Sequence, residues 1–217
     1  IRIYSMKDKK SGAFRRLFER SQSDLQNVKD AVDRIIREVK KNGDAALVRY
    51  AQKFDDAAFQ KDQLRVRLRD IREAYENVNR NVLAAIKKQI KLAREFAEEQ
   101  RSCIKDWEKD TGKGIVYGEK WTAIDSVGLY IPGGKNPFPT VAQILAVPST
   151  IAGCSRIVAA ISPKGNQYET LVALAECGVT EIYRMSGAQA IAAMSYGTAT
   201  IPPVELIAGP GSPGVTA

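Results

Sequence analysis

The sequence predicts an α/β protein in which a helical N-terminal part is followed by an incomplete parallel sheet with helices on both faces. Two observations indicate this fold. In the first half, apolar residues recur at intervals of three and four among charged residues, which is typical of amphipathic helices. In the second half, short runs rich in Val, Ile and Ala alternate with helix-length segments bounded by glycine. Strands connected through helices form parallel sheets with right-handed crossovers.

The composition indicates a globular protein. Its 217 residues are 44% hydrophobic, which is enough for a core in one large domain or two small ones. No apolar run reaches the length of about 18 residues that a transmembrane helix needs, and the first residues do not resemble a signal peptide. The three cysteines are widely spaced and odd in number, which disfavours a disulfide framework. We therefore expect a cytoplasmic protein without a membrane partner.

The chain contains no histidine, and this excludes several kinds of site. A His-based zinc site, a Ser-His-Asp triad and a Cys-His pair cannot form within it. The net charge is +8, and residues 121–217 contribute −1 of it, so the basic excess lies in the first part. A basic region can bind nucleic acid, but here both signs are interspersed along helices, as on a solvated surface. We therefore expect no nucleic-acid partner.

The first 54 residues are expected to be mainly helical. Residues 1–12 are polar and predicted to be a loose lead-in, and residues 13–20 to form two helical turns. A longer helix is expected to begin at Ser23, with Gln26 three residues on as in a capping box. Asn42-Gly43 is expected to end it, and Asp44 to cap the next helix.

The segment after residue 55 is predicted to contain one strand, two helices and a hairpin. Leu64, Val66 and Leu68 alternate with arginines, which is the pattern of a strand with one wet face. Asp70 is expected to cap the first helix, and residues 81–101 to form the second. Trp107 is then expected to pack at the end of this helical layer. The hairpin is predicted from strands at residues 115–117 and 121–124, with a turn near residues 118–119.

A soft boundary near residues 112–126 divides the chain into parts 1–126 and 127–217. The second part is predicted to contain four strands, at residues 127–131, 156–161, 181–185 and 206–208. The helices between them are predicted at residues 141–152, 167–177 and 188–196. Pro148 lies inside the first of these helices and is expected to kink or break it.

Three of the four strands end in loops of small residues. These loops are Pro132-Gly133-Gly134, Ser186-Gly187 and Gly209-Pro210-Gly211. Because ligands of open α/β sheets bind beyond the carboxyl ends of the strands, three glycine-bearing loops on one edge favour a ligand cleft. The alternative is a set of plain turns that bind nothing, since no G-x-G-x-x-G or G-x-x-x-x-G-K-[ST] motif occurs.

Three polar or aromatic residues are candidates for ligand contact at this edge. Gln189 lies in the first turn of a predicted helix, where unpaired N–H groups favour an anion, and its amide can hydrogen-bond a ligand. The alternative for Gln189 is a solvent-facing polar residue. Tyr130 can stack on a ring or cap the sheet, and Ser212 can donate to a ribose or phosphate or fill a turn. These residues support binding but supply no acid–base mechanism.

The assembled motifs resemble the histidinol dehydrogenase family in order and spacing. They are residues 127–135 (Val-Gly-Leu-Tyr-Ile-Pro-Gly-Gly-Lys), Pro148 with residues 151–153, residues 187–193 with 196–198, and residues 207–211. Residues 42–47, followed by Phe54-Asp55, resemble the family in the helical part. The resemblance covers nearly the whole chain.

The resemblance implies a zinc-dependent homodimer with Rossmann-like halves that oxidises L-histidinol to L-histidine. The reaction has two NAD-dependent steps, passes through the aldehyde and closes histidine biosynthesis. By resemblance, Tyr130 and Gln189 contact NAD, and Pro132 and Gly133 belong to the cofactor-binding loop. Ser212 stands where the family usually has Asn, which puts that cofactor contact in question.

The resemblance also implies that the chain is an N-terminal portion or a truncated relative. The family's zinc ligands and its Glu-His acid–base pair all follow the Gly-Pro-Gly motif, and this chain has no histidine. We therefore expect no catalytic or metal-ligating residue here and no activity of the chain alone. Two alternatives remain open: a family relative that oxidises another alcohol, and a non-catalytic binding protein that kept the fold.

Overall fold

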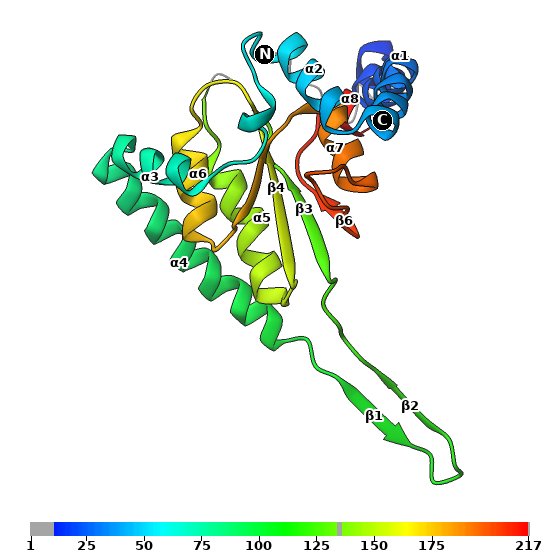
Figure 1. Cartoon of the computed structure of the whole chain (residues 1–217). Coiled ribbons are helices and arrows are strands. Elements are labelled where there is room, and N and C mark those ends of the chain that lie inside the picture. Colours follow the sequence, from blue (N-terminus) through cyan, green and yellow to red (C-terminus); the bar gives the residue numbers. More distant parts are fainter. Residues whose placement is uncertain (1–10, 134–135, 217) are drawn as a thin grey trace.

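The structure is a computed structural model that describes residues 11–133 and 136–216, with the backbone alone described at residues 13 and 15–27. Its centre is a parallel sheet of four strands in the order β5-β4-β3-β6 (Figure 1). The strands are β3 (Ser126–Tyr130), β4 (Arg156–Ile161), β5 (Glu181–Arg184) and β6 (Leu206–Ala208). The predicted α/β fold with a parallel sheet is therefore confirmed.

One face of the sheet is covered by two layers of helices. The inner layer is α5 (Pro139–Ala152) and α6 (Tyr168–Glu176), and the outer is α3 (Leu68–Asn77) and α4 (Arg80–Ser102) (Figure 1). Alternate strand residues such as Val127, Leu129 and Ile131 point into this layer. They meet buried side chains of all four helices, so the helical part and the sheet share one core. The division of the chain near residue 126 stays a prediction.

The other face of the sheet is covered by α7 (Gly187–Tyr196), with α1 (Gly12–Asn42) and α2 (Asp44–Phe54) packed beyond it. The remaining strand residues, including Tyr130, Val158 and Ala160, point to this side. Helix α7 is rich in alanine and buried on nearly all sides, so it can pack close to the strands. A last short helix, α8 (Pro213–Thr216), contacts both α1 and α7.

The N-terminal helix is longer than predicted. It is one helix from Gly12 to Asn42, and the Ser11 side chain caps it by accepting from the Phe14 N–H at 3.2 Å. The predicted start at Ser23 is wrong. Serine is tolerated inside a helix, and a capping-box pattern alone does not make a new helix begin. The predicted end at Asn42-Gly43 is confirmed, and the Gly43 N–H donates to the Val39 carbonyl at 2.8 Å.

The strand predicted around residues 64–68 is wrong. A 3₁₀ turn, η2 (Lys61–Gln63), precedes it, and a single bridge joins Arg65 to Tyr183 of β5. Leu64 and Val66 are buried, but Leu68 is 73% exposed because α3 begins there. Asp70 lies at the third position of α3 and accepts from the Arg67 N–H at 2.9 Å, so it caps the helix from inside it.

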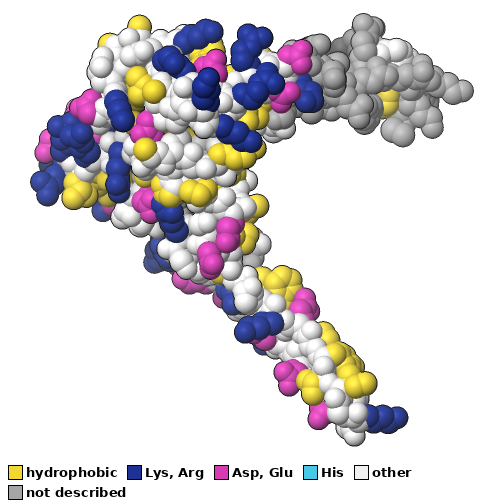
Figure 2. Space-filling view, turned by 45° about the vertical axis from the view of Figure 1, so that its right-hand side comes forward, with side chains coloured by type: hydrophobic (Ala, Val, Ile, Leu, Met, Phe, Trp, Pro, Cys, Tyr) yellow, Lys and Arg dark blue, Asp and Glu magenta, His cyan; other side chains and the backbone are white. Residues whose placement is uncertain are grey.

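The hairpin is also placed differently from the prediction. Its strands are β1 (Trp107–Asp110) and β2 (Val116–Glu119), and they pair antiparallel with the turn at residues 111–115. The predicted strand at residues 121–124 is therefore wrong. The hairpin projects from the body as an arm, and hydrophobic side chains lie along it (Figures 1 and 2). Trp107 is 50% exposed on this arm, so its predicted packing on the helical layer is wrong too.

Helix α5 continues through Pro148 without the break that the sequence suggested. Proline removes one backbone donor from a helix and leaves carbonyl groups of the preceding turn unsatisfied. Here the Ser149 hydroxyl donates to the Leu145 carbonyl at 2.8 Å, and the Thr150 hydroxyl donates to the Ala146 carbonyl at 2.9 Å. These side-chain bonds go to the carbonyls of Leu145 and Ala146, whereas the carbonyl that loses its backbone donor at Pro148 is that of Ile144, four residues earlier. Within the described residues no helix is long and apolar enough to cross a membrane.

Asp44 does not cap α2 as predicted but ties it to the loop after α7. It is the first residue of α2, is 4% exposed, and accepts from the Thr200 hydroxyl at 2.6 Å. Burial raises the pKa of Asp44, but hydrogen bonds from Thr198 and Thr200 and the charge of Lys61 outweigh burial and hold the pKa below 3.8. The carboxylate therefore stabilises the contact between α2 and the residue 198–201 loop.

We expect Asp44→Asn to lower the free energy of unfolding by about 1–3 kcal/mol at neutral pH, because a buried charged hydrogen bond is lost. Since the folded pKa is depressed, this stabilisation is present above the unfolded pKa and is lost as the pH falls through the folded value. Urea unfolding from pH 7 down to pH values below 3.8 measures the shrinking difference. Asp33→Asn, at an exposed pair with Lys29, is the control and should change stability by less than about 0.5 kcal/mol.

Candidate functional site

The loops after β3, β5 and β6 meet at the carboxyl edge of the sheet, as expected from the parallel strand order. The Gly187 N–H, after β5, donates to the Tyr130 hydroxyl at the end of β3 at 3.1 Å. Gly209, after β6, lies against the Tyr130 backbone so closely that a Cβ there would overlap the Tyr130 carbonyl oxygen. The three loops therefore close around Tyr130, and any side chain at Gly209 would separate them.

Tyr130 is 6% exposed and lies on the α7 side of the sheet. Burial raises the pKa of its phenol and the charge of Asp55 adds to this effect, while the hydrogen bond from Gly187 opposes it. The phenol is therefore neutral at physiological pH. It accepts from the first N–H of α7, a group that has no partner within the helix.

Gln189 is only 3% exposed, so the alternative of a solvent-facing residue is wrong. The reason is that α7 is packed between the sheet and the outer helices α1 and α2. Its side chain folds back over Gly187, and a Cβ on Gly187 would lie 2.8 Å from the Gln189 Oε1. The Gln189 amide makes no hydrogen bond in the part of the chain that the structure describes. Among the described residues, Gln143 Oε1 is the only fully buried side-chain polar atom without a partner, so the Gln189 amide keeps some contact with solvent. An unpartnered amide that is still reachable at this edge is a candidate for ligand contact.

The remaining predicted residues lie at the rim. Pro132 is half-buried and Gly133 is exposed, with Gly133 turned against Ser162 of the loop after β4. Gly134 and Lys135 of the same motif lie outside the described residues. Ser212 is exposed, and its carbonyl accepts from the Val215 N–H at 2.8 Å at the start of α8. Its hydroxyl makes no hydrogen bond to the described residues, so it is available to a ligand.

Sequence reasoning missed a polar cluster beside Tyr130, formed by Asp55, Ser162 and Ser186. The Ser186 hydroxyl donates to the Asp55 carboxylate at 2.7 Å, and Ser162 is buried nearby. Burial raises the pKa of Asp55, while hydrogen bonds from Ser186 and Ser162 and the charge of Lys164 oppose that rise. No local signal marks Asp55 in the sequence, because an acidic residue after a helix is typical of an ordinary loop.

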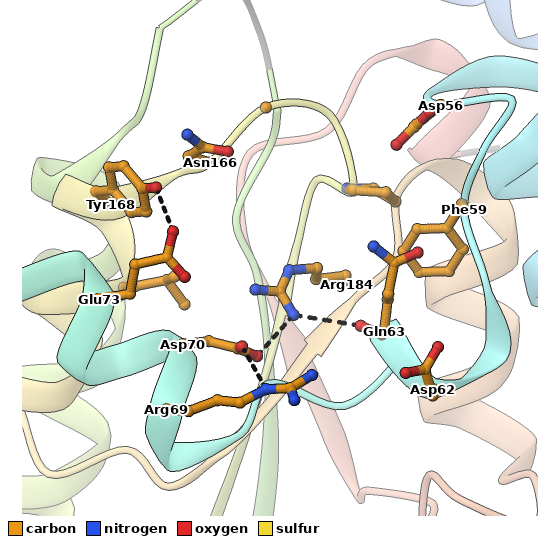
Figure 3. Close-up of a pocket in the computed structure, with 13 residues that line it drawn as sticks. Asp56, Phe59, Asp62, Gln63, Arg69, Asp70, Glu73, Asn166, Tyr168 and Arg184 are labelled. Carbon is orange, nitrogen blue, oxygen red and sulfur yellow. Dashed lines mark hydrogen bonds and ion pairs between the residues drawn. The ribbon is translucent and has the colours of Figure 1, made fainter. Parts of the chain in front are cut away.

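A cavity of about 310 Å³ lies beside the ends of β4 and β5 (Figure 3). Its charged groups are already paired: Arg184 lies 3.1 Å from the Asp70 carboxylate, and the Tyr168 hydroxyl donates to Glu73 at 2.7 Å. Burial raises the pKa of Asp70, but the Arg67 N–H and Arg184 outweigh burial and lower it overall. We interpret this network as structural, because its hydrogen bonds and ion pair join α3 to β5 and α6.

The described residues contain no group of three or more Cys, Asp or Glu side chains that could hold a metal ion. The chain also has no histidine. The residues present therefore do not fit the zinc ion that the sequence resemblance implies.

Comparisons with known proteins agree on one family. The family model described as histidinol dehydrogenase matches residues 18–217. A histidinol dehydrogenase of Thermosynechococcus vestitus is 38% identical over 98% of this chain and 50% of its own length. One of Agrobacterium fabrum is 41% identical over 88% of this chain and 44% of its own length.

A solved structure gives the same result at the level of the fold. The crystal structure of histidinol dehydrogenase from Elizabethkingia anophelis superposes with a TM-score of 0.81 and 29% identity. The match covers 87% of this chain and 43% of that one. The chain thus spans about half the length of the curated relatives it matches.

We expect Gly187→Ala to disrupt the contact with Tyr130. Gly187 has φ +61°, and its Cβ would meet Gln189, so strain and overlap act together. The free energy of unfolding should fall by about 2 kcal/mol or more, as measured by urea denaturation. Gly165→Ala is the matched control, because Gly165 has φ +70° and open space around its Cβ. Equal losses in the two variants would show that the overlap with Gln189 contributes nothing.

Proposed function

The chain belongs to the histidinol dehydrogenase family, and we propose that it forms the nucleotide-binding side of an enzyme that oxidises L-histidinol to L-histidine with NAD. The observation that carries this proposal is the closure of three loops around Tyr130 beside the unpartnered amide of Gln189. An amide that no described residue bonds is free to bond a ligand at this edge of the sheet. We propose the oxidation of this substrate for the whole protein, because this chain matches only about half the length of its relative.

The residues at the sheet edge fit a dinucleotide. The N–H groups of Ala188 and Gln189 point out of the first turn of α7 and make no hydrogen bond to any described residue, so they can receive a diphosphate. The Gln189 amide can bond a polar group of the nucleotide. Gly133 lies so close to Ser162 that a side chain there would overlap it, and the exposed Ser212 hydroxyl can replace the contact of the family's Asn.

NAD would supply the hydride acceptor for the two oxidation steps that pass through the aldehyde. The residues of this chain would hold and orient the nucleotide, and none of those that the structure describes is placed as a base. The Tyr130 phenol is neutral and Asp55 is engaged by two serine hydroxyls. The zinc ion would need ligands from outside this chain, and we derive no step through it.

The family also suggests the setting in which this chain works. We propose a cytoplasmic enzyme of histidine biosynthesis that acts on a small-molecule substrate and forms a homodimer as the full-length protein. Figure 2 shows Lys and Arg side chains interspersed with Asp and Glu over the face it presents. This mixture of signs is typical of a solvated surface and does not favour a nucleic-acid partner.

We expect the chain to bind NAD in isothermal titration calorimetry. Gln189→Ala and Tyr130→Ala should each weaken binding about tenfold or more, because each removes a polar group that contacts or positions the ligand. Tyr130→Phe, which keeps the ring, separates the hydroxyl's role from packing. Tyr117→Ala, on the exposed hairpin, is the control and should bind as the unchanged chain does. Absence of binding at millimolar NAD would refute this part of the proposal.

We expect no oxidation of L-histidinol by this chain alone, with or without added zinc. The chain lacks histidine, and the parts that the structure describes hold no metal cluster, so neither the ion nor a base is in place. NADH formation followed at 340 nm, a wavelength set by the reduced cofactor, measures this. Sustained turnover by the purified chain would contradict the expectation and indicate a base among its own residues.

A further inference from the structure

We infer that Asp55 is a positioning residue that prevents Ser186 from capping α7, and so keeps the first-turn N–H groups of that helix available to the nucleotide's diphosphate. Ser186 is the N-cap residue of α7, yet its side chain makes no capping hydrogen bond. Its hydroxyl donates instead to the Asp55 carboxylate at 2.7 Å. The inference rests on the proposed binding of NAD at this edge.

Serine at an N-cap ordinarily accepts a hydrogen bond from the second or third N–H of the helix. In α7 those groups belong to Ala188 and Gln189, and neither makes a hydrogen bond to a described residue. The first N–H, of Gly187, is bound by the Tyr130 hydroxyl. One donor is therefore used to hold Tyr130, and the next two are left for a ligand.

The carboxylate of Asp55 is held where its charge is disfavoured. It follows the last residue of α2, at the negative end of that helix dipole, and it is half-buried. Burial accordingly raises the pKa of Asp55. Hydrogen bonds from Ser186 and Ser162 and the charge of Lys164 oppose this rise in the pKa without reversing it. A charge-assisted bond of 2.7 Å is strong enough to hold the Ser186 hydroxyl away from its own helix.

A second observation points to a ligand at the same helix end. Gln189 is 3% exposed, lies in the first turn of α7, and has an amide with no partner among the described residues. Three polar groups of one helical turn are thus left unsatisfied together: the two N–H groups and this amide. An arrangement that served only stability would use the serine as a cap, which is worth about 1 kcal/mol.

The experiment is a rescue series on the full chain, with NAD affinity measured by calorimetry. Asp55→Ala should weaken NAD binding about tenfold, because the released Ser186 hydroxyl caps the N–H groups that the diphosphate needs. Ser186→Ala alone should bind nearly as the unchanged chain does. The double variant Asp55→Ala/Ser186→Ala should recover most of the affinity, since no hydroxyl remains to cap the helix. A purely structural role for Asp55 predicts no such recovery.

Two controls keep the series decisive. Asp56→Ala removes a neighbouring exposed carboxylate that accepts from the Ala58 N–H at 3.0 Å, and it should leave NAD affinity unchanged. Asp55→Asn preserves the shape of the side chain, and it replaces Asp55→Ala in the series if the alanine variant does not fold. Undiminished binding by both Asp55 variants, or a double variant no better than Asp55→Ala, overturns the inference.

Amide hydrogen exchange at Ala188 and Gln189, followed by NMR without nucleotide, separates this inference from the proposed function. Exchange should slow in Asp55→Ala and become fast again in the double variant, because only the released serine can protect these groups. If the unchanged chain does not bind NAD, the proposed function fails while this exchange pattern still decides the role of Asp55. Identical exchange in all variants refutes that role.

Discussion

The parallel pairing of β3 with both β4 and β6 is the constraint on which the rest of the structure depends. It places Tyr130 in the middle of the sheet's carboxyl edge, between loops that lie far apart in the sequence. Parallel strands must all end at the same edge, so the loops after β3, β5 and β6 have no other place to go. A candidate site at this edge therefore follows from the topology, whatever the loops contain.

The two faces of the sheet impose different demands on their helices. On one face, two layers of helices join the N-terminal part to the sheet through a single apolar core. On the other, α7 packs close to the sheet, and six of its ten residues are Gly, Ala or Ser. Close packing brings the first turn of α7 to within hydrogen-bond distance of Tyr130, and a side chain at Gly187 would meet the end of the Gln189 side chain. Dense packing and the geometry of the site are thus consequences of the same small residues.

The candidate site is defined by hydrogen-bond donors in the first turn of α7 that no described residue uses. Tyr130 binds one N–H of α7, Asp55 engages the serine that would bind the others, and the Gln189 amide has no partner among the described residues. The bonds of Tyr130 and Asp55 are made, whereas the Gln189 amide and the next two N–H groups of α7 have no partner among the described residues in the absence of a ligand. These groups lie together at one point on the sheet edge, where we propose that the nucleotide binds.

The sequence by itself determined the strands and helices of the second half. Short apolar runs that alternate with helix-length segments bounded by glycine are local signals, and burial in a parallel sheet reinforces them. It also determined which loops share an edge, and through their motifs the family. Local signals were misleading where packing was absent or unusual: Trp107 projects on an exposed arm, and Ser23 lies inside a continuous helix. Only the tertiary structure decided that Gln189 is buried and that Asp55 meets Ser186. Those two residues are 131 positions apart, and no local periodicity specifies a hydrogen bond over such a separation.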